Sequence, residues 1–433
     1  MSHKVVIVGG GFAGLYAAQS LRREPVEVTL IDRRNFHLFQ PLLYQVATGG
    51  LSPGEIASPL RFVLNRQKNA RVLLGEVVDI DIQSREVILA DLSRLPYDTL
   101  IVATGATHHY FGHPEWAAHA PGLKTVEDAT EIRTRILLAF ERAEKTTDHA
   151  ERAALLTFVV VGGGPTGVEL AGALGEISRD TLRADFRSIN PAEARIFLLE
   201  GADRLLQTYP EDLSLSAERS LIELGVRTRV GAKVTAIDGG GVTMITKGGE
   251  DHIAARTVLW AAGVQASPLG KILAERTGVG LDAAGRVGVD GWLAVPGHPQ
   301  ILVVGDLARV VQDGAQVPGV APAAMQQGRY AARLMAERLR GQTSGQTRGQ
   351  TIPAFRYRDK GSLATIGRNR AVAMIGRFRF TGYIAWLLWL FIHLLYIVEF
   401  ESRVMIAIQW GFAYFTFNRG ARLITGDSGR TRV

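Results

Sequence analysis

Cysteine is absent from this chain of 433 residues. Without a thiol, the chain can form no disulfide, bind no metal through a thiolate and hold no cysteine-ligated iron–sulfur cluster. A redox-active cysteine pair is excluded for the same reason.

Runs of basic residues are also missing. The 49 Lys and Arg outnumber the 42 Asp and Glu, for a formal net charge of +7. No block of them resembles a nucleic-acid-binding arm, so the sequence predicts no nucleic-acid partner. An anionic membrane surface is the other partner that this charge fits. With 47% hydrophobic and 21% charged residues, the composition is that of a folded protein of two or three domains.

A metal site is not indicated either. Four histidines lie close in sequence, but they follow no helical ligand spacing and no acidic partner recurs among them. They are His108, His109, His113 and His119. We expect them on the surface of a loop, with no metal.

The N-terminus does not have the pattern of a signal peptide. Only three residues precede the run 4–8, which is predicted as a buried strand, and a glycine loop follows it instead of a cleavage site. We therefore expect residues 1–370 in the cytoplasm or an equivalent compartment.

The clearest positive feature is an internal repeat. The segment 5–14, VVIVGGGFAG, returns at 158–167 as FVVVGGGPTG. Each copy is an apolar run of strand length, followed by glycines and a helix-forming stretch. This is the opening strand and helix of a dinucleotide-binding domain, present twice, and further short apolar runs after each copy predict parallel sheets.

The three glycines of each copy have different predicted roles. The first allows the tight turn out of the strand, the second lets the backbone approach a pyrophosphate at a helix N-terminus, and the third lets the helix pack closely on the sheet. In this order they are Gly9, Gly11 and Gly14 in the first copy and Gly162, Gly164 and Gly167 in the second. The competing interpretation is an ordinary strand–turn–helix corner.

An acidic residue closes the second predicted strand of each copy. These residues are Asp32 and Glu200, and a carboxylate there can hold the ribose hydroxyls of an adenosine. Because Glu200 repels a 2′-phosphate, NADH is favoured over NADPH. The nearby Arg204 leaves NADPH as an open alternative.

Two nucleotide units, with a later strand at 301–304 rejoining the first, suggest FAD plus a nicotinamide nucleotide. Segments 103–105, 260–264 and 304–306 resemble the crossover and flavin-site segments of the two-dinucleotide-binding-domain flavoprotein reductases. The resemblance implies that Asp306 holds FAD near its ribityl-phosphate end. The cofactor-binding residues predicted with it are Arg33, Thr104, Gly105, Thr166, Gly263 and Gln326.

A narrower resemblance covers nearly the whole chain. Segments 40–49, 361–368 and 414–423 resemble the flavin-side loop, the start of the C-terminal domain and the tail of the type II NADH:quinone oxidoreductases. This resemblance implies a single-subunit enzyme that passes two electrons from NADH through FAD to ubiquinone or menaquinone without pumping protons. The alternative is an NADH-reactive flavoprotein that uses a non-quinone acceptor or acts as a redox-sensing interaction protein.

The chain departs from this family's pattern at two positions. Pro322 stands where the family commonly has a glutamine that contacts quinone, and Ala173 stands where it has a second glutamate. The family's other glutamine and glutamate are present as Gln326 and Glu169, which we predict as the catalytic residues. Glu176 is a candidate replacement from the next helical turn.

The C-terminal part contains two apolar runs, 380–398 and 404–417, flanked by arginines. We expect two helices in the headgroup layer of a membrane, with the arginines on anionic lipid. The arginines are Arg377, Arg379, Arg403, Arg419 and Arg422. A single membrane span, buried core helices or a dimer interface are the alternatives. Residues 380–423 are thus predicted to contact lipid on the cytoplasmic face of a bacterial inner membrane, in a homodimer.

The expected fold is α/β, with two Rossmann-like domains and a C-terminal helical segment. We assign 1–117 and 265–352 to a discontinuous FAD-binding domain, 118–264 to an NADH-binding domain and 353–433 to a membrane-anchoring domain.

Overall fold

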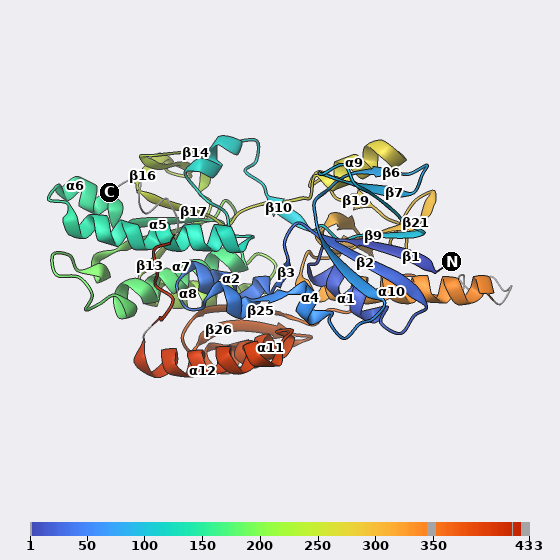
Figure 1. The fold of residues 1–433 in the computed structure, drawn as a ribbon. Coiled ribbons are helices and arrows are strands. Elements are labelled where there is room, and N and C mark those ends of the chain that lie inside the picture. The colour runs from blue at the N-terminus through green and yellow to red at the C-terminus, as the bar shows by residue number, and fades with distance from the viewer. Residues whose placement is uncertain (1, 344–351, 418, 426–433) are drawn as a thin grey trace. The chain divides into compact units, whose positions relative to one another are not determined.

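Two compact units make up the chain in a computed structural model, which describes residues 2–343, 352–417 and 419–425 (Figure 1). Unit 1 consists of Met1–Leu38, Ala57–Thr107 and Val264–Lys360. Unit 2 consists of Phe39–Ile56, His108–Gly263 and Gly361–Val433. Each unit contains one of the two sequence repeats.

Unit 1 is built on a six-stranded sheet in the order β20-β21-β9-β1-β2-β5. All neighbouring strands are parallel except β20 and β21. The pairing of β21 with β9 is the return of a late strand that the sequence predicts. The strands are β1 (His3–Val8), β2 (Val26–Asp32), β5 (Ala70–Leu74), β9 (Thr99–Val102), β20 (Ala294–Val295) and β21 (His298–Val303).

Helices α1 (Phe12–Ser20) and α10 (Ala321–Thr343) pack against each other beside this sheet. Their contact needs a glycine, because a Cβ at Gly328 would lie 2.1 Å from the carbonyl oxygen of Ala13. The other larger elements of unit 1 are α4 (Leu60–Val63), α9 (Leu269–Thr277), β6 (Val77–Asp81), β7 (Glu86–Leu89) and β8 (Arg94–Pro96).

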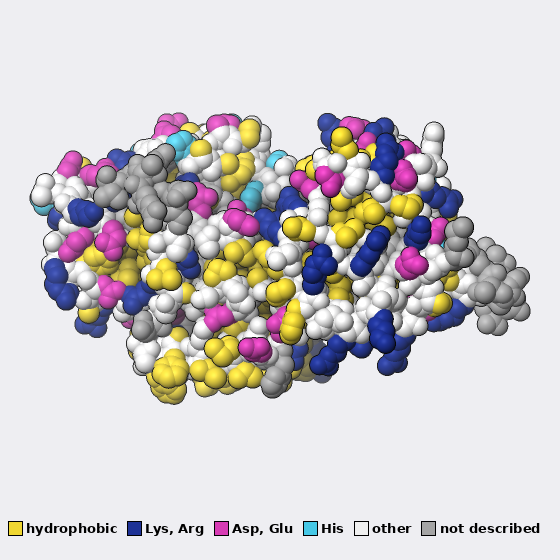
Figure 2. All heavy atoms as spheres, viewed as in Figure 1, with side chains coloured by type: hydrophobic (Ala, Val, Ile, Leu, Met, Phe, Trp, Pro, Cys, Tyr) yellow, Lys and Arg dark blue, Asp and Glu magenta, His cyan; other side chains and the backbone are white. Residues whose placement is uncertain are grey.

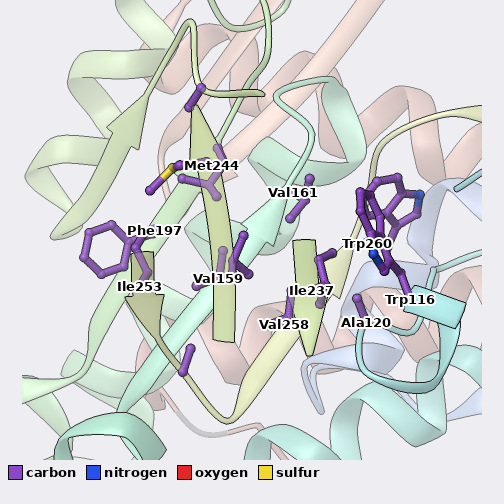
Figure 3. Close-up of a cluster of buried hydrophobic side chains, with 14 residues drawn as sticks. Trp116, Ala120, Val159, Val161, Phe197, Ile237, Met244, Ile253, Val258 and Trp260 are labelled. Atoms are coloured by element: carbon purple, nitrogen blue, oxygen red, sulfur yellow. The ribbon is translucent and has the colours of Figure 1, made fainter. Parts of the chain in front are cut away.

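Unit 2 contains a four-stranded parallel sheet in the order β13-β12-β11-β17 and a three-stranded antiparallel sheet, β14-β15-β16. The strands are β11 (Thr157–Val161), β12 (Arg195–Leu199), β13 (Val226–Arg229), β14 (Lys233–Asp238), β15 (Gly241–Thr246), β16 (Gly249–Ala254) and β17 (Thr257–Trp260). A buried cluster joins the two sheets, with Trp116 and Trp260 at one end and Phe197 and Met244 at the other (Figure 3).

The helices of unit 2 have the following bounds: α2 (Leu43–Ala47), α3 (Pro53–Ile56), α5 (Val126–Lys145), α6 (His149–Leu155), α7 (Pro165–Glu176), α8 (Glu211–Glu223), α11 (Gly382–Tyr396) and α12 (Phe400–Thr416). A small antiparallel sheet of β25 (Ser362–Gly367), β26 (Arg370–Ile375) and β27 (Phe378–Thr381) precedes α11. None of the helices in the described residues is long and apolar enough to cross a membrane.

The α/β fold class predicted from the sequence is confirmed, with a parallel sheet after each glycine repeat and two helices in the C-terminal part. The three domain ranges stay a prediction, because they group residues by expected ligand. Packing groups them differently: Phe39–Ile56 and Gly361–Val433 both belong to unit 2.

We predict that Gly172→Ala destabilises unit 2, because the new Cβ would lie 1.7 Å from the carbonyl oxygen of Ile366 in β25. Overpacking of this kind costs about 1–3 kcal/mol, more than the ~1 kcal/mol that alanine contributes inside a helix. The measurement is the midpoint of thermal unfolding, which should fall.

The matched control is Gly411→Ala in α12, where a Cβ would meet no atom within 4 Å. This variant should keep or raise the midpoint. An equal response of the two variants would contradict the close contact between α7 and β25.

Candidate active site

The glycine loop of unit 1 follows β1, which lies between β2 and β9. Gly9 has φ +105°, and a Cβ there would lie 2.4 Å from the carbonyl oxygen of Ala103. A Cβ at Gly14 would lie 1.8 Å from the carbonyl oxygen of Gly9. Both positions therefore require glycine, for the tight turn and the close helix packing that the sequence predicts.

The same loop leaves room beside the N-terminus of α1. A Cβ at Gly11, the N-cap residue, would meet nothing within 4 Å, so its backbone is accessible to a ligand. The Asp32 carboxylate lies next to it and accepts hydrogen bonds from the amides of Gly10 (2.6 Å) and Arg34 (2.7 Å). Burial raises the pKa of Asp32.

Unit 2 repeats this arrangement. Gly162 has φ +110°, and a Cβ at Gly167 would lie 1.8 Å from the carbonyl oxygen of Gly162. A Cβ at Gly164 would again meet nothing within 4 Å. The Glu200 carboxylate accepts a hydrogen bond from the Gly163 amide at 2.6 Å. Both predicted loops thus bring their acid to the amide of the middle residue of the Gly-Gly-Gly run.

Arg204 is held by its own loop. Its guanidinium donates hydrogen bonds to the carbonyl oxygens of Gln207 and Tyr209, both at 2.8 Å. A guanidinium in this position is already engaged and offers little to a 2′-phosphate, so the carboxylate of Glu200 dominates the charge at its loop.

The other predicted residues of unit 1 follow β9 and β21. The Thr104 hydroxyl oxygen is buried and has no hydrogen-bond partner in the described part of the chain. Gly105 has φ +68°, and its carbonyl accepts a hydrogen bond from the Ser267 amide at 3.0 Å. Asp306 lies in a short 3-10 helix directly after β21, and Arg33 is exposed beside Asp32.

Sequence reasoning missed His37 in unit 1. Its side chain is 1% exposed, and burial lowers its pKa to about 4. The neutral ring can donate from Nδ1 to the carbonyl oxygen of Gly10 at 3.0 Å, which leaves Nε2 buried without a partner among the described residues. The three-residue strand Phe36–Leu38 that places it carries no distinct periodic signal.

Two predicted residues of unit 2 lie at the edges of its loops. Thr166 is exposed in the first turn of α7. Gly263 has φ +68°, and a Cβ there would lie 2.7 Å from the Phe111 ring. Gly263 is thus required for packing against the loop that follows His109.

A cavity of about 130 Å³ lies within unit 2. Its walls come from segments far apart in the sequence: the α2 region, α7, the β25–β26 turn, α11, α12 and the tail after α12. Glu169 and Glu176 line it from α7, Trp389 from α11 and Trp410 from α12. The cavity is therefore lined by aromatic rings from α11 and α12 and by carboxyl groups from α7, with Arg368 and Arg419 also in its walls.

Glu169 is the predicted catalytic residue that lies in this cavity. Burial raises its pKa to about 8, although the amide of Thr365, 3.5 Å from the carboxylate, favours the charged form. The Trp389 indole N–H also favours the charged form, but its geometry falls short of a hydrogen bond. At neutral pH the carboxyl group is therefore mostly protonated.

Glu176 forms an internal ion pair. The Arg419 guanidinium lies 2.7 Å from its carboxylate, is only 13% exposed and also donates to the Thr48 hydroxyl at 2.9 Å. Arg422 pairs in the same way with Asp185. The prediction that Arg419 contacts lipid is wrong, because a largely buried carboxylate of unit 2 already holds it. Arg422 pairs with an acid on the surface of unit 2, and its contact with lipid stays a prediction.

Gln326, the second predicted catalytic residue, belongs to unit 1. Its side-chain amide donates to the carbonyl oxygen of Arg358 at 2.9 Å and accepts from the Arg358 amide at 3.0 Å. The neighbouring Gln327 accepts from the Gly305 amide at 2.6 Å, next to Asp306. The catalytic role of Gln326 stays a prediction.

Comparison with known proteins gives a consistent result. Residues 3–328 match the pyridine nucleotide-disulphide oxidoreductase family. The type II NADH:quinone oxidoreductase NdhA of Mycobacterium tuberculosis is 49% identical, over 98% of this chain and 90% of its own. Ndh of the same organism, also a type II NADH:quinone oxidoreductase, is 46% identical over 100% of this chain and 92% of its own.

Among solved structures, NDH2 of Plasmodium falciparum in complex with NADH superposes with a TM-score of 0.87 at 21% identity. The match covers 98% of this chain and 100% of that one. At this identity the likeness concerns the fold.

Glu169 should make stability depend on pH. Its folded pKa of about 8 lies above the ordinary value of 4.5, so between these pH values the folded protein binds more protons than the unfolded chain. The contribution of Glu169 to stability should then fall as the pH rises from about 4.5 to about 8. Because Glu169→Gln removes this contribution, we predict that the stability of the variant relative to the parent increases across the interval, as measured by thermal unfolding.

Glu250→Gln, an exposed position in β16, is the control and should leave the pH dependence of the parent unchanged. Identical slopes for Glu169→Gln and the parent would show that Glu169 ionises normally.

Proposed function

The chain belongs to the type II NADH:quinone oxidoreductases, and on this premise we propose that it binds FAD in unit 1, NADH in unit 2 and the quinone head in the cavity beside Glu169. The protein is an oxidoreductase that transfers electrons from NADH to a quinone by way of a flavin. The position of each partner is our proposal. The observation that carries it is a cavity in which the Glu169 carboxyl group lies together with aromatic side chains of α11 and α12.

FAD fits the residues of unit 1. The open backbone at Gly11 and the N-terminus of α1 suit a pyrophosphate, and the Asp32 carboxylate suits the adenosine ribose. The buried Thr104 hydroxyl lacks a partner that a ligand can provide. The Asp306 carboxylate, for which the described residues show no hydrogen bond, is available for the ribityl end. When bound, FAD supplies a two-electron carrier between a hydride donor and a quinone.

NADH fits unit 2 for the same reasons. Gly164 leaves its backbone open, and the carboxylate of Glu200 can accept from ribose hydroxyls while it repels a 2′-phosphate. Thr166 lies beside this loop, in the first turn of α7. Since Arg204 is bound to backbone carbonyls, we propose NADH rather than NADPH as the donor.

The cavity supplies what quinone reduction requires from the protein. In the overall reaction NADH, one proton and quinone give NAD⁺ and quinol. Because NADH supplies only a hydride, the second hydrogen of the quinol must come from a separate proton donor. Glu169, with a pKa of about 8, can hold that proton at neutral pH. The rings of Trp389 and Trp410, with centroids 5.3 Å apart, form an apolar wall for the quinone ring.

We propose that α11 and α12 rest on a lipid surface. Along α11, exposed apolar side chains recur every four residues at Tyr383, Leu387, Phe391 and Leu395. On α12, exposed side chains include Val404, Ile408, Phe412 and Phe415. Figure 2 shows hydrophobic side chains gathered over these helices. The quinone is itself a lipid, and the two helices that carry the apolar face also line the cavity.

The placement on the cytoplasmic face of a bacterial inner membrane and the homodimer also stay proposals. The exposed apolar face of α11 and α12 fits a second copy of the chain as well as a lipid surface. The test of membrane contact therefore also measures, by light scattering, whether the protein in solution is one chain or two.

The reaction itself provides the central test. Detergent-purified protein should oxidise NADH without oxygen only when a short-chain ubiquinone or menaquinone analogue is present. The flavin absorbance should bleach rapidly with NADH, slowly with NADPH, and return on addition of quinone. Chromatography of the released flavin should identify FAD.

Two other results would change the conclusions. A flavin that NADH bleaches but no quinone reoxidises would favour a non-quinone acceptor, and release of FMN would overturn the FAD proposal.

Glu200→Gln, which keeps an oxygen acceptor but removes the charge, should lower the ratio of kcat/KM for NADH to that for NADPH roughly tenfold, equivalent to ~1.4 kcal/mol. Glu193→Gln, at an exposed position just before β12, should leave the preference unchanged.

Membrane contact can be tested with Phe391→Ser/Phe412→Ser. These side chains are 60% and 69% exposed, and burying a phenylalanine contributes about 1.5–3 kcal/mol. The double variant should lose at least roughly tenfold in partitioning to phosphatidylglycerol vesicles in a flotation assay.

The control is Phe62→Ser/Leu92→Ser in unit 1, which removes two side chains that are 57% and 80% exposed. This variant should float like the parent. If the α11–α12 variant floats normally but its particle mass in light scattering falls to that of one chain, the apolar face is a contact between copies instead.

A further inference from the structure

A chain of hydrogen bonds runs along one wall of the unit 2 cavity. The Trp410 indole Nε1 lies 2.8 Å from Gln45 Oε1, and Gln45 Nε2 lies 2.9 Å from the Tyr44 hydroxyl oxygen. All three residues line the cavity. These two hydrogen bonds play no part in the glycine loops or in the catalytic role predicted for Glu169.

The direction of the chain follows from the chemistry of its members. An indole N–H can only donate, so the Gln45 atom that meets Trp410 must be the amide oxygen. The amide nitrogen of Gln45 then faces Tyr44, and because it too can only donate, the Tyr44 oxygen must accept. The phenolic proton of Tyr44 is therefore directed away from Gln45.

That proton has no acceptor in the described part of the chain. Tyr44 is 7% exposed, so bulk water does not satisfy the proton, and a buried donor left unpaired is costly. The Trp410 ring, at the other end of these hydrogen bonds, is held in place because it packs on Trp389 with ring centroids 5.3 Å apart. A ligand oxygen in the cavity can supply the missing acceptor.

We propose that the Tyr44 hydroxyl donates a hydrogen bond to a carbonyl oxygen of the bound quinone, and that Gln45 and Trp410 are positioning residues that direct it. The inference rests on the proposed quinone site and assigns a residue for head-group recognition at it. A quinone oxygen gains negative charge during reduction, so this hydrogen bond strengthens as the reaction proceeds.

The electrostatic surroundings agree with this role. Burial raises the pKa of Tyr44 well above its ordinary value, and the nearby Glu169 carboxyl raises it further when ionised. Tyr44 thus stays protonated at neutral pH and acts as a donor. Glu169 holds a transferable proton on the same cavity, so the two residues supply a hydrogen bond and a proton respectively.

Tyr44→Phe removes the donor and keeps the ring. We expect kcat/KM for quinone to fall by roughly ten- to a hundredfold, the loss expected for one hydrogen bond to a charge-bearing oxygen. The rate at which NADH bleaches the flavin should not change, which also shows that the variant folds. Tyr330→Phe, whose hydroxyl donates to the Pro353 carbonyl oxygen in unit 1, is the control and should leave kcat/KM unchanged.

Gln45→Glu tests the direction of the chain. In this variant an ionised carboxylate can accept from Trp410 but cannot donate to Tyr44. It therefore accepts a hydrogen bond from the Tyr44 hydroxyl, which is then no longer free to donate to quinone, and activity should fall as in Tyr44→Phe. A protonated carboxyl group again has one acceptor and one donor, so the variant should regain activity as the pH is lowered. A purely structural role would give no such recovery relative to the parent.

Trp410→Phe frees the amide of Gln45 to rotate and should lower kcat/KM for quinone less than Tyr44→Phe does. In the double variant with Tyr44→Phe the two losses should not add. Trp292→Phe, which removes an indole that donates to the Ile352 carbonyl oxygen, is the control and should leave kcat/KM unchanged.

The two levels of proposal fail in different ways. If the parent protein does not reduce quinone, the proposed function fails. If the parent reduces quinone and Tyr44→Phe does so with an unchanged kcat/KM, only the role of Tyr44 is overturned. Additive losses, or a Gln45→Glu variant whose pH profile matches the parent, would overturn the role of the chain.

Discussion

In both units, the hydrogen bond between the middle glycine amide of the Gly-Gly-Gly run and the carboxylate at the end of the neighbouring strand organises the proposed nucleotide site. The Gly10–Asp32 and Gly163–Glu200 distances are both 2.6 Å. This contact forms because Gly9 and Gly162 turn the chain at positive φ while the parallel strands end side by side. The open glycine that follows, the helix N-terminus and the position of the acid proposed to bind a ribose all depend on that turn.

The cavity of unit 2 obeys a different constraint. Several of its polar groups are paired with partners that lie hundreds of residues away in the chain. Arg419 meets Glu176 and Thr48, and Trp410 meets Gln45. Burial makes every unpaired polar atom costly, so the side chains of such a wall are held in fixed positions. The Tyr44 proton has no acceptor among the described residues, and it therefore indicates where a ligand oxygen can bind.

The sequence predicted correctly those features that depend on adjacent residues, and it failed for features that depend on contacts between distant segments. The two glycine loops and their acids were predicted residue by residue, because turn geometry and strand order follow from a few adjacent residues. The arginines after α12 were assigned to lipid from their neighbourhood of apolar residues. Arg419 and Arg422 reach acids on and after α7, and nothing adjacent in the chain indicates this. His37 was missed for a similar reason, since its partner is the backbone of Gly10.

The sequence by itself therefore determined the fold class, the two glycine loops, the family and the apolar C-terminal helices. Periodicity, glycine spacing and motif order are properties of neighbouring residues and can be read without coordinates. Only the tertiary structure decided which side chains share the cavity, that burial raises the pKa of Glu169 and that Gln45 donates to the Tyr44 hydroxyl oxygen. Burial and hydrogen-bond direction are set by groups that meet only when distant segments pack together.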